Sequence, residues 1–149
     1  MTGKAVSATI LVVDDEPPLL RLVARVLERQ DFTVLTASDG DEAIDLFDKH
    51  IDSIDGVLLD IFLPPNGVAE VMDHMISARG DLVVILSSGD DPEPAIAEKL
   101  KSQGGAFLRK PYLPKAMLKL LETQLDAKRQ SRRERGHDES VPGREQEDV

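Results

Sequence analysis

The chain has 149 residues, with 28 acidic against 18 basic side chains and a net charge of −10. This length allows one domain with a tail, and the acidity argues against general binding to nucleic acid or to anionic membrane surfaces. Cysteine is absent, which excludes disulfides, thiolate nucleophiles and cysteine-based metal sites. No apolar run approaches the roughly 18–20 residues that span a bilayer, and the N-terminus lacks a signal-peptide core. We therefore expect a cytoplasmic protein without membrane insertion.

Short apolar runs alternate with amphipathic helical patterns along the chain. The apolar runs predict strands at residues 9–13, 32–37, 56–59, 82–86 and 106–108. Apolar residues at helical spacing predict a helix that begins at Pro17-Pro18 and four more, at residues 41–50, 69–79, 94–103 and 113–125. Five strands that alternate with five helices indicate an α/β fold with a parallel sheet covered on both faces.

The composition changes near residue 126. Residues 126–149 carry six basic and seven acidic side chains but only two large aliphatic ones. Such a segment buries too little apolar surface to offset its ordering entropy, so we predict that most of it is disordered. Its basic stretch, residues 128–135, fits a solvated continuation of the last helix better than a nucleic-acid contact. The predicted organisation is an N-terminal extension (1–7), a folded domain (8–125) and a charged tail (126–149).

Polar side chains follow four of the five predicted strands. The first strand is followed by Asp14-Asp15-Glu16, the third by Asp60, the fourth by Ser87-Ser88 and the fifth by Arg109-Lys110-Pro111. In an open parallel sheet, ligands bind beyond the carboxyl ends of the strands. The sequence therefore predicts that carboxylates, a hydroxyl group and a lysine meet at one edge of the sheet.

This set of residues fits phosphoryl transfer. Clustered carboxylates repel one another unless a cation joins them, and their hard oxygen atoms suit magnesium. Asp60 could then act as a nucleophile toward phosphorus, with Lys110 and Ser87 binding phosphoryl oxygens. Each position also has a simpler interpretation, because Asp15 or Glu16 before two prolines could cap a helix, and Lys110 or Ser87 could be an ordinary loop residue.

The pattern resembles the receiver domain of two-component response regulators, over about residues 8–125. The segments that carry the resemblance are ILVVDDEP (10–17), ASDGDEAIDLF (37–47), DGVLLDIFLPPNG (55–67), VVILSSGD (83–90) and GGAFLRKPY (104–112). The resemblance implies a flavodoxin-like, doubly wound five-stranded sheet of order 2-1-3-4-5 with one functional site. It implies a stand-alone receiver, because nothing after residue 125 is expected to fold.

The resemblance also implies roles for individual residues. Asp14 and Asp15 match the acidic pair that holds Mg²⁺, together with the phosphoacceptor Asp60 and the backbone carbonyl of Phe62. Lys110 matches the lysine that pairs with the phosphoryl group, and it precedes a proline to which this family often joins it by a cis bond.

Two further positions match the switch of the family. Ser87 corresponds to the residue that binds the phosphoryl group and shifts toward it. Phe107 corresponds to the aromatic residue that turns inward when Ser87 moves, as part of a two-state population shift.

The loop after Asp60 departs from the family pattern. Pro64 and Gly67 are three residues apart, where the commoner spacing is four. Phe62 is large and apolar where many receivers have a smaller or polar residue. We hypothesise that Phe62 and Gly89 orient the attacking water poorly, so that the phosphorylated form is long-lived.

The implied function is a phosphorylation-controlled signalling switch. It accepts a phosphoryl group from a sensor histidine kinase or histidine phosphotransfer protein onto Asp60, catalyses only its own phosphorylation and dephosphorylation, and signals to an unknown protein by contact. A phosphate relay or sink and a degenerate receiver that needs no phosphorylation stay open. A magnesium-dependent phosphohydrolase with an aspartyl nucleophile would need a second acid at the position of Phe62, and the acidic first loop disfavours a flavin-binding module.

Overall fold

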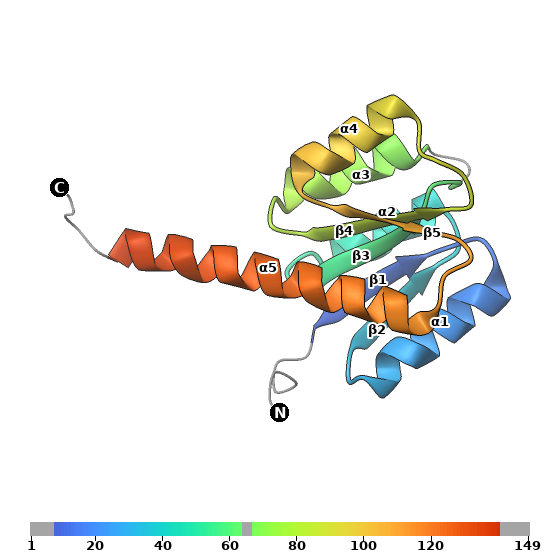
Figure 1. The fold of residues 1–149 in the computed structure, drawn as a ribbon, viewed down its shortest axis with the longest axis horizontal. Coiled ribbons are helices and arrows are strands. Elements are labelled where there is room, and N and C mark those ends of the chain that lie inside the picture. Colours follow the sequence, from blue (N-terminus) through green and yellow to red (C-terminus); the bar gives the residue numbers. More distant parts are fainter. Residues whose placement is uncertain (1–7, 64–66, 141–149) are drawn as a thin grey trace.

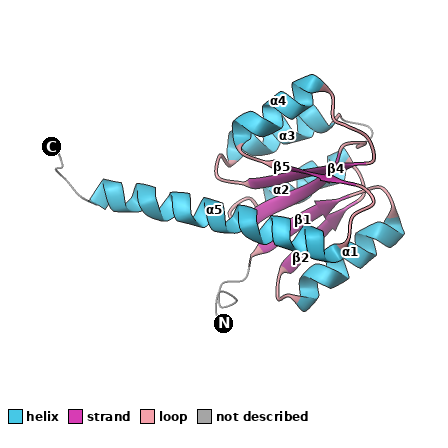
Figure 2. Cartoon of the chain, viewed as in Figure 1, coloured by secondary structure: helices cyan, strands magenta, loops and turns pink. Residues whose placement is uncertain are grey.

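The computed structural model describes residues 8–63 and 67–140, the last nine of these as backbone only. The strands are β1 (Thr9–Val13), β2 (Thr33–Ala37), β3 (Ile54–Asp60), β4 (Val83–Ser88) and β5 (Ala106–Arg109). The helices are α1 (Pro17–Arg29), α2 (Gly40–Lys49), α3 (Val68–Ala78), α4 (Pro94–Gln103) and α5 (Pro114–Ser140). Strands and helices alternate strictly along the described chain, as the sequence predicts (Figures 1 and 2).

The five strands form one parallel sheet in the order β2-β1-β3-β4-β5. This order confirms the predicted flavodoxin-like α/β fold. Three strands extend further than predicted, since β3 spans Ile54–Asp60, β4 ends at Ser88 and β5 ends at Arg109. Asp60 and Ser87 therefore lie within the sheet itself, as register partners on adjacent strands.

Helices cover both faces of the sheet and divide the core into two clusters (Figure 1). On one face α2, α3 and α4 pack against the sheet through residues such as Phe47, Met72 and Leu100. On the other face α1 and α5 pack through Leu27 and Met117, among others. The central strands are buried on both faces, which explains their continuous apolar sequences.

Local signals in the sequence set several helix ends. Two prolines occupy the first turn of α1, where a missing N–H costs no hydrogen bond. The Asp39 side chain caps α2 by accepting a hydrogen bond of 2.8 Å from the Glu42 N–H. Gly104 ends α4 in the left-handed conformation, at a φ of 82°. Gly105 follows where the chain passes close to β4, because a Cβ there would lie 2.6 Å from the Val84 carbonyl oxygen.

The last helix differs from the sequence-based expectation. It continues past the predicted domain boundary at residue 125 and ends at Ser140. Its extension includes residues 128–135, which the sequence favours as a continuation of this helix, and further residues for which we predict disorder. Residues 126–140 include Ala, Lys, Arg, Gln and Glu, which have high intrinsic helix propensity. A helix that is already packed at its base can therefore extend without further burial. The N-terminal extension (1–7) and residues 141–149 lie outside the described residues.

No described helix combines the length and the apolar composition that crossing a lipid bilayer requires.

Candidate functional site

The predicted site residues meet at the carboxyl edge of the sheet. Asp14 follows β1, Asp60 ends β3, Ser87 lies in β4 and Lys110 follows β5. The register pairs Asp60 with Ser87, and the Lys110 N–H donates a hydrogen bond of 2.8 Å to the Ser88 carbonyl. Lys110 thus contacts Asp60 and Asp14, from which it is separated by 50 and 96 positions in the sequence.

Three carboxylates form the acidic part of the site. Asp14, Asp15 and Asp60 each offer an oxygen atom, and these atoms all lie within 4.8 Å of one another. Asp14 and Asp60 are each 4% exposed, whereas Asp15 is exposed to solvent. This arrangement gives a divalent cation three oxygen ligands and access from one side.

Lys110 provides the positive charge at the centre of this cluster. Its Nζ atom lies 2.8 Å from Asp14 Oδ2, 3.3 Å from Asp60 Oδ2 and 3.5 Å from Glu16 Oε1. Burial lowers the pKa of the Lys110 ammonium, but the hydrogen bond and charge of Asp14 and those of Asp60 outweigh burial and hold the pKa above its ordinary value. Lys110 is therefore protonated throughout the physiological range.

The Asp60 carboxylate is held at both oxygen atoms. Oδ2 faces Lys110, and Oδ1 accepts a hydrogen bond of 3.2 Å from the Phe62 N–H. Burial raises the pKa of Asp60, and the charge of Asp14 adds to this effect. The Phe62 N–H and Lys110 oppose the rise without cancelling it. The ionised form of Asp60 is therefore costly in the absence of further positive charge.

Glu16 and Tyr112 also lie at the site, although the sequence suggests only a helix cap for Glu16 and no functional role for Tyr112. Glu16 occupies the N-cap position of α1, yet its side chain makes no cap hydrogen bond and instead faces Lys110. Burial, followed by the charge of Asp14, raises the pKa of the Tyr112 phenol to about 12. The signal for Glu16 is its spacing of two residues from Asp14, since the Glu16 N–H donates to Asp14 Oδ1 at 2.9 Å. Tyr112 has no comparable signal.

The residues predicted to form the switch lie on opposite faces of the sheet. Ser87 is buried beside Asp60, with 2% of its surface exposed. Phe107 is half-buried and packs against the cluster under α2, α3 and α4. The Arg109 guanidinium lies 5.9 Å from the centre of the Phe107 ring. The same guanidinium donates to the Gly89 carbonyl at 2.9 Å, and it pairs with Asp91. Arg109 thus connects the β4–α4 loop with the aromatic residue.

The loop after Asp60 is described only in part. The Phe62 side chain points outward and is 66% exposed, whereas Leu63 is buried. The shortened spacing begins at Pro64, which lies outside the described residues. The assignment of the Phe62 carbonyl as a metal ligand stays a prediction.

A family model described as the response regulator receiver domain matches residues 10–122. The transcriptional regulatory protein CpxR of Escherichia coli (strain K12) is 28% identical over 134 residues, covering 89% of this chain and 56% of CpxR. CpxR of Klebsiella pneumoniae is 35% identical over 119 residues, covering 69% of this chain and 50% of that protein. The chain therefore spans about half the length of the curated relatives it matches.

Solved structures resemble this chain over most of its length. A response regulator receiver domain protein from Clostridium thermocellum superposes with a TM-score of 0.73 at 27% sequence identity. The match covers 82% of this chain and 97% of that structure. The likeness thus includes nearly all of a receiver domain, in both sequence and fold.

Proposed function

Because the chain belongs to the response regulator receiver family, we propose that it is a phosphorylation-controlled signalling switch in which Asp60 accepts the phosphoryl group. Receiver domains are phosphoacceptors rather than classical enzymes, and they imply a two-component partner kinase. We propose a sensor histidine kinase or a histidine phosphotransfer protein as the donor. The observation that carries the proposal is the Asp60 carboxylate, clustered with Asp14 and Asp15 and 3.3 Å from the Lys110 ammonium.

The charge balance of the cluster supports a metal-binding role. When ionised, the three carboxylates carry three negative charges, and Lys110 supplies one positive charge close to two of them. The remaining charge fits a divalent cation, and oxygen ligands favour Mg²⁺. We propose that Asp14, Asp15, Asp60 and the Phe62 carbonyl hold this ion. When bound, Mg²⁺ would neutralise charge on the phosphoryl oxygens.

Phosphoryl transfer to Asp60 is an in-line displacement. One Asp60 oxygen forms a bond to phosphorus while the phosphorus–nitrogen bond of the donor phosphohistidine breaks, and the electron pair leaves with the imidazole nitrogen. The Phe62 N–H orients the Asp60 carboxylate. Lys110 is close enough to exchange its ion pair with Asp14 for one with the phosphoryl group, which carries a charge of about −1.5 to −2.

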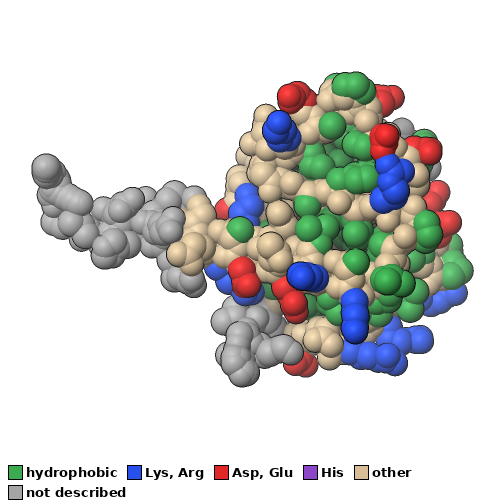
Figure 3. All heavy atoms as spheres, viewed as in Figure 1, with side chains coloured by type: hydrophobic (Ala, Val, Ile, Leu, Met, Phe, Trp, Pro, Cys, Tyr) green, Lys and Arg blue, Asp and Glu red, His purple; other side chains and the backbone are tan. Residues whose placement is uncertain are grey.

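The phosphoryl group then changes the surface that partners contact. Ser87, as the register partner of Asp60, is placed to donate a hydrogen bond to a phosphoryl oxygen. Its movement would shift Phe107 between two positions and alter the population of a second state in α4, β5 and α5. Hydrophobic side chains gather between α4 and α5 on the face shown in Figure 3, which favours output by protein contact.

Other functions receive less support. A hydrolase with an aspartyl nucleophile needs an acid two residues after that nucleophile, and this chain has Phe62 there. A phosphate relay or sink would use the chemistry proposed here, with a second histidine protein as acceptor. A receiver that needs no phosphorylation would have little use for Asp60 and Lys110 in this arrangement.

Phosphorylation by a small donor tests the proposal. The full chain is incubated with Mg²⁺ and acetyl phosphate or phosphoramidate, and the intact mass is measured. We expect one added phosphoryl group on the parent and on the control Asp41→Asn, which changes an exposed acid on α2. We expect none on Asp60→Asn or in the presence of EDTA. An unmodified parent, or equal modification of Asp60→Asn, would contradict the proposal. Pull-downs with and without beryllium fluoride would then identify partners.

A further inference from the structure

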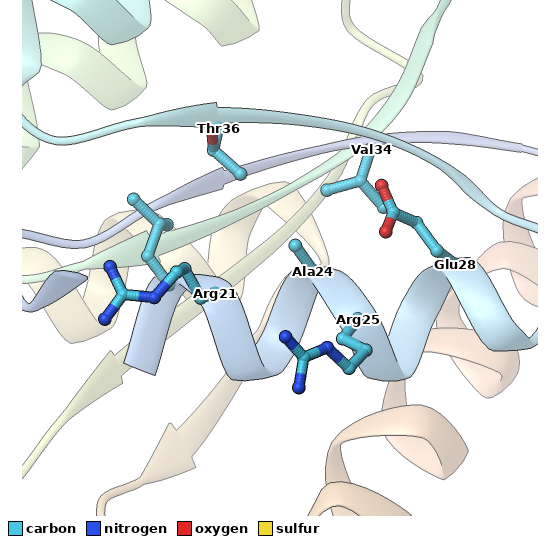
Figure 4. A pocket seen from close by; sticks show the side chains of 7 residues that line it. Arg21, Ala24, Arg25, Glu28, Val34 and Thr36 are labelled. Atoms are coloured by element: carbon cyan, nitrogen blue, oxygen red, sulfur yellow. The ribbon is translucent and has the colours of Figure 1, made fainter. Parts of the chain in front are cut away.

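A groove lies between α1 and the edge strand β2, away from the cluster around Asp60. Its volume is about 350 Å³. Six of the side chains that line it are Leu20, Arg21, Ala24, Arg25, Val34 and Thr36. We call this feature the α1–β2 groove. Figure 4 shows Ala24 and Glu28 pointing from α1 toward β2, with Arg25 extending from the other side of the helix.

The outer edge of β2 presents unpaired backbone groups along this groove. The Thr33 N–H donates to the Ala8 carbonyl at 2.9 Å, and the Ala37 carbonyl accepts from the Asp14 N–H at 3.1 Å. These bonds point toward β1, and alternate residues of a parallel strand face opposite edges. Val34 and Thr36 therefore direct their N–H and carbonyl groups outward, where the sheet of the described residues has no further strand.

The sequence of β2 contains none of the residues that usually prevent another chain from pairing with an edge strand. The strand reads TVLTA and contains neither a charged residue nor a proline. Natural edge strands usually carry such residues, which prevent another chain from pairing with them. An uncharged edge rich in β-branched residues is instead suited to accept an additional strand.

Two arginines give the groove a positive wall. Arg21 and Arg25 are exposed, and neither has a hydrogen-bond or ion-pair partner among the side chains that the structure describes. Like charges one helical turn apart disfavour a helix, so this pair does not serve the stability of α1. Basic side chains gather over α1 on an otherwise acidic protein (Figure 3). Because salt screens charges beyond about 8 Å, the local arginines rather than the net charge determine what binds here.

We propose that the α1–β2 groove binds an extended peptide with carboxylates at alternate positions, which pairs with β2 as a sixth strand. Arg21 and Arg25 are about 6 Å apart along the helix axis. Side chains two residues apart on one face of a strand are about 6.6 Å apart. Two acidic side chains at positions i and i+2 therefore match the two guanidiniums. The intervening residues point to the opposite face, where the half-buried Leu35 favours apolar side chains.

The groove also determines which end of the bound peptide carries the acidic side chains. Arg21 lies near Thr36 and Glu28 lies near Val34, since α1 and β2 run in opposite directions (Figure 4). The acidic side chains belong at the Thr36 end. A neutral or basic side chain belongs beside Glu28.

The test uses fluorescein-labelled synthetic hexapeptides and the full chain. Fluorescence anisotropy measures binding of a glutamate–valine peptide that has glutamate at only two alternate positions and valine elsewhere, with a peptide that has lysine at those two positions as the control. The double variant Arg21→Gln/Arg25→Gln should weaken binding about tenfold, as expected for the loss of two surface ion pairs. The variant Lys49→Gln/Lys101→Gln loses the same charge on α2 and α4, which cover the other face of the sheet, and should bind like the parent. Equal binding of both peptides, or no effect of the arginine substitutions, would overturn the proposal.

A second measurement tests the backbone pairing. Thr36→Pro removes the outward N–H at that position while retaining the hydrogen bonds to β1, and it should abolish binding. Hydrogen exchange on the parent keeps the test independent of whether this variant folds. The Thr36 N–H should exchange more slowly with the glutamate–valine peptide, whereas the Thr33 N–H should not change. Unchanged exchange at Thr36 would overturn the proposal. Dimerisation through this edge without peptide binding would do the same.

Discussion

Lys110→Met removes the only ammonium group within the acidic cluster of the described residues while retaining a side chain of similar length. Its attractions to Asp14 and Asp60, at 2.8 and 3.3 Å, amount to about 5–6 kcal/mol each at an effective dielectric constant of about 20. The desolvation cost of Lys110 offsets much of this, and the substitution also removes that cost. The two carboxylates stay buried without their partner. We expect a net loss of about 3 kcal/mol in the free energy of unfolding.

Thermal unfolding in EDTA at neutral pH measures this loss. A change of about 3 kcal/mol lowers the Tm of a domain of this size by roughly 6–12 °C. Lys99→Met is the matched control, because Lys99 forms one ion pair of 2.7 Å with the exposed Asp73. It should cost at most about 1 kcal/mol. In an Asp60→Asn background, Lys110→Met should lower the free energy of unfolding by less than it does in the parent, because the ion pair between Lys110 and Asp60 is already absent.

Added Mg²⁺ distinguishes charge repulsion from lost packing. If the carboxylates destabilise the Lys110→Met variant, Mg²⁺ should raise its Tm more than it raises that of the parent. A Tm for Lys110→Met within about 2 °C of the parent would refute the reasoning. An equal effect of Mg²⁺ on the two proteins would refute it as well.

Three further predictions concern single residues. Because the pKa of Asp60 is raised, its ionisation costs stability, so Asp60→Asn should be more stable than the parent at neutral pH in EDTA. Urea unfolding should show this gain shrinking as the pH falls through the raised pKa of Asp60, with no gain left below about 4. A gain that is largest in acid would contradict it. Phosphorylated Asp60 should persist for minutes and decay faster in Phe62→Asn, as followed by intact mass; decay within seconds in the parent would count against poorly oriented water. Gly105→Ala should destabilise the domain more than Gly104→Ala, because a Cβ at position 105 would lie 2.6 Å from the Val84 carbonyl oxygen. A Cβ at position 104 meets no atom within 4 Å, so that substitution costs about 1 kcal/mol through the φ of 82° alone. Equal urea midpoints for the two variants would argue against this.

The sequence predicts the fold because buried parallel strands and amphipathic helices have distinct patterns. It predicts the neighbourhood of Asp14, Asp60 and Lys110 because the carboxyl ends of parallel strands share one edge of the sheet. The first two residues of β3 were missed, since a buried strand gives no signal for where pairing begins. The proximity of Tyr112 to the cluster depends on side-chain positions that spacing alone does not determine.

The α1–β2 groove and the end of α5 were not predictable for different reasons. The groove depends on how α1 lies against an edge strand, and periodicity does not contain that information. The prediction of disorder for most of residues 126–149 treats burial as the main source of order. That assumption overlooks the way in which a packed helix lowers the cost of adding residues to its end.

Because α5 is long, a small tilt near Asp60 would displace the far end of the helix by a larger distance. The helix starts four residues after Lys110, at the edge of the sheet where phosphorylation is proposed, and its 27 residues span about 40 Å. It leaves the body of the protein at the other edge (Figure 1). A tilt of about 5° in its first turn would displace its distal end by about 3.5 Å. The helix can thus act as a lever that magnifies a rearrangement too slight to alter the sheet.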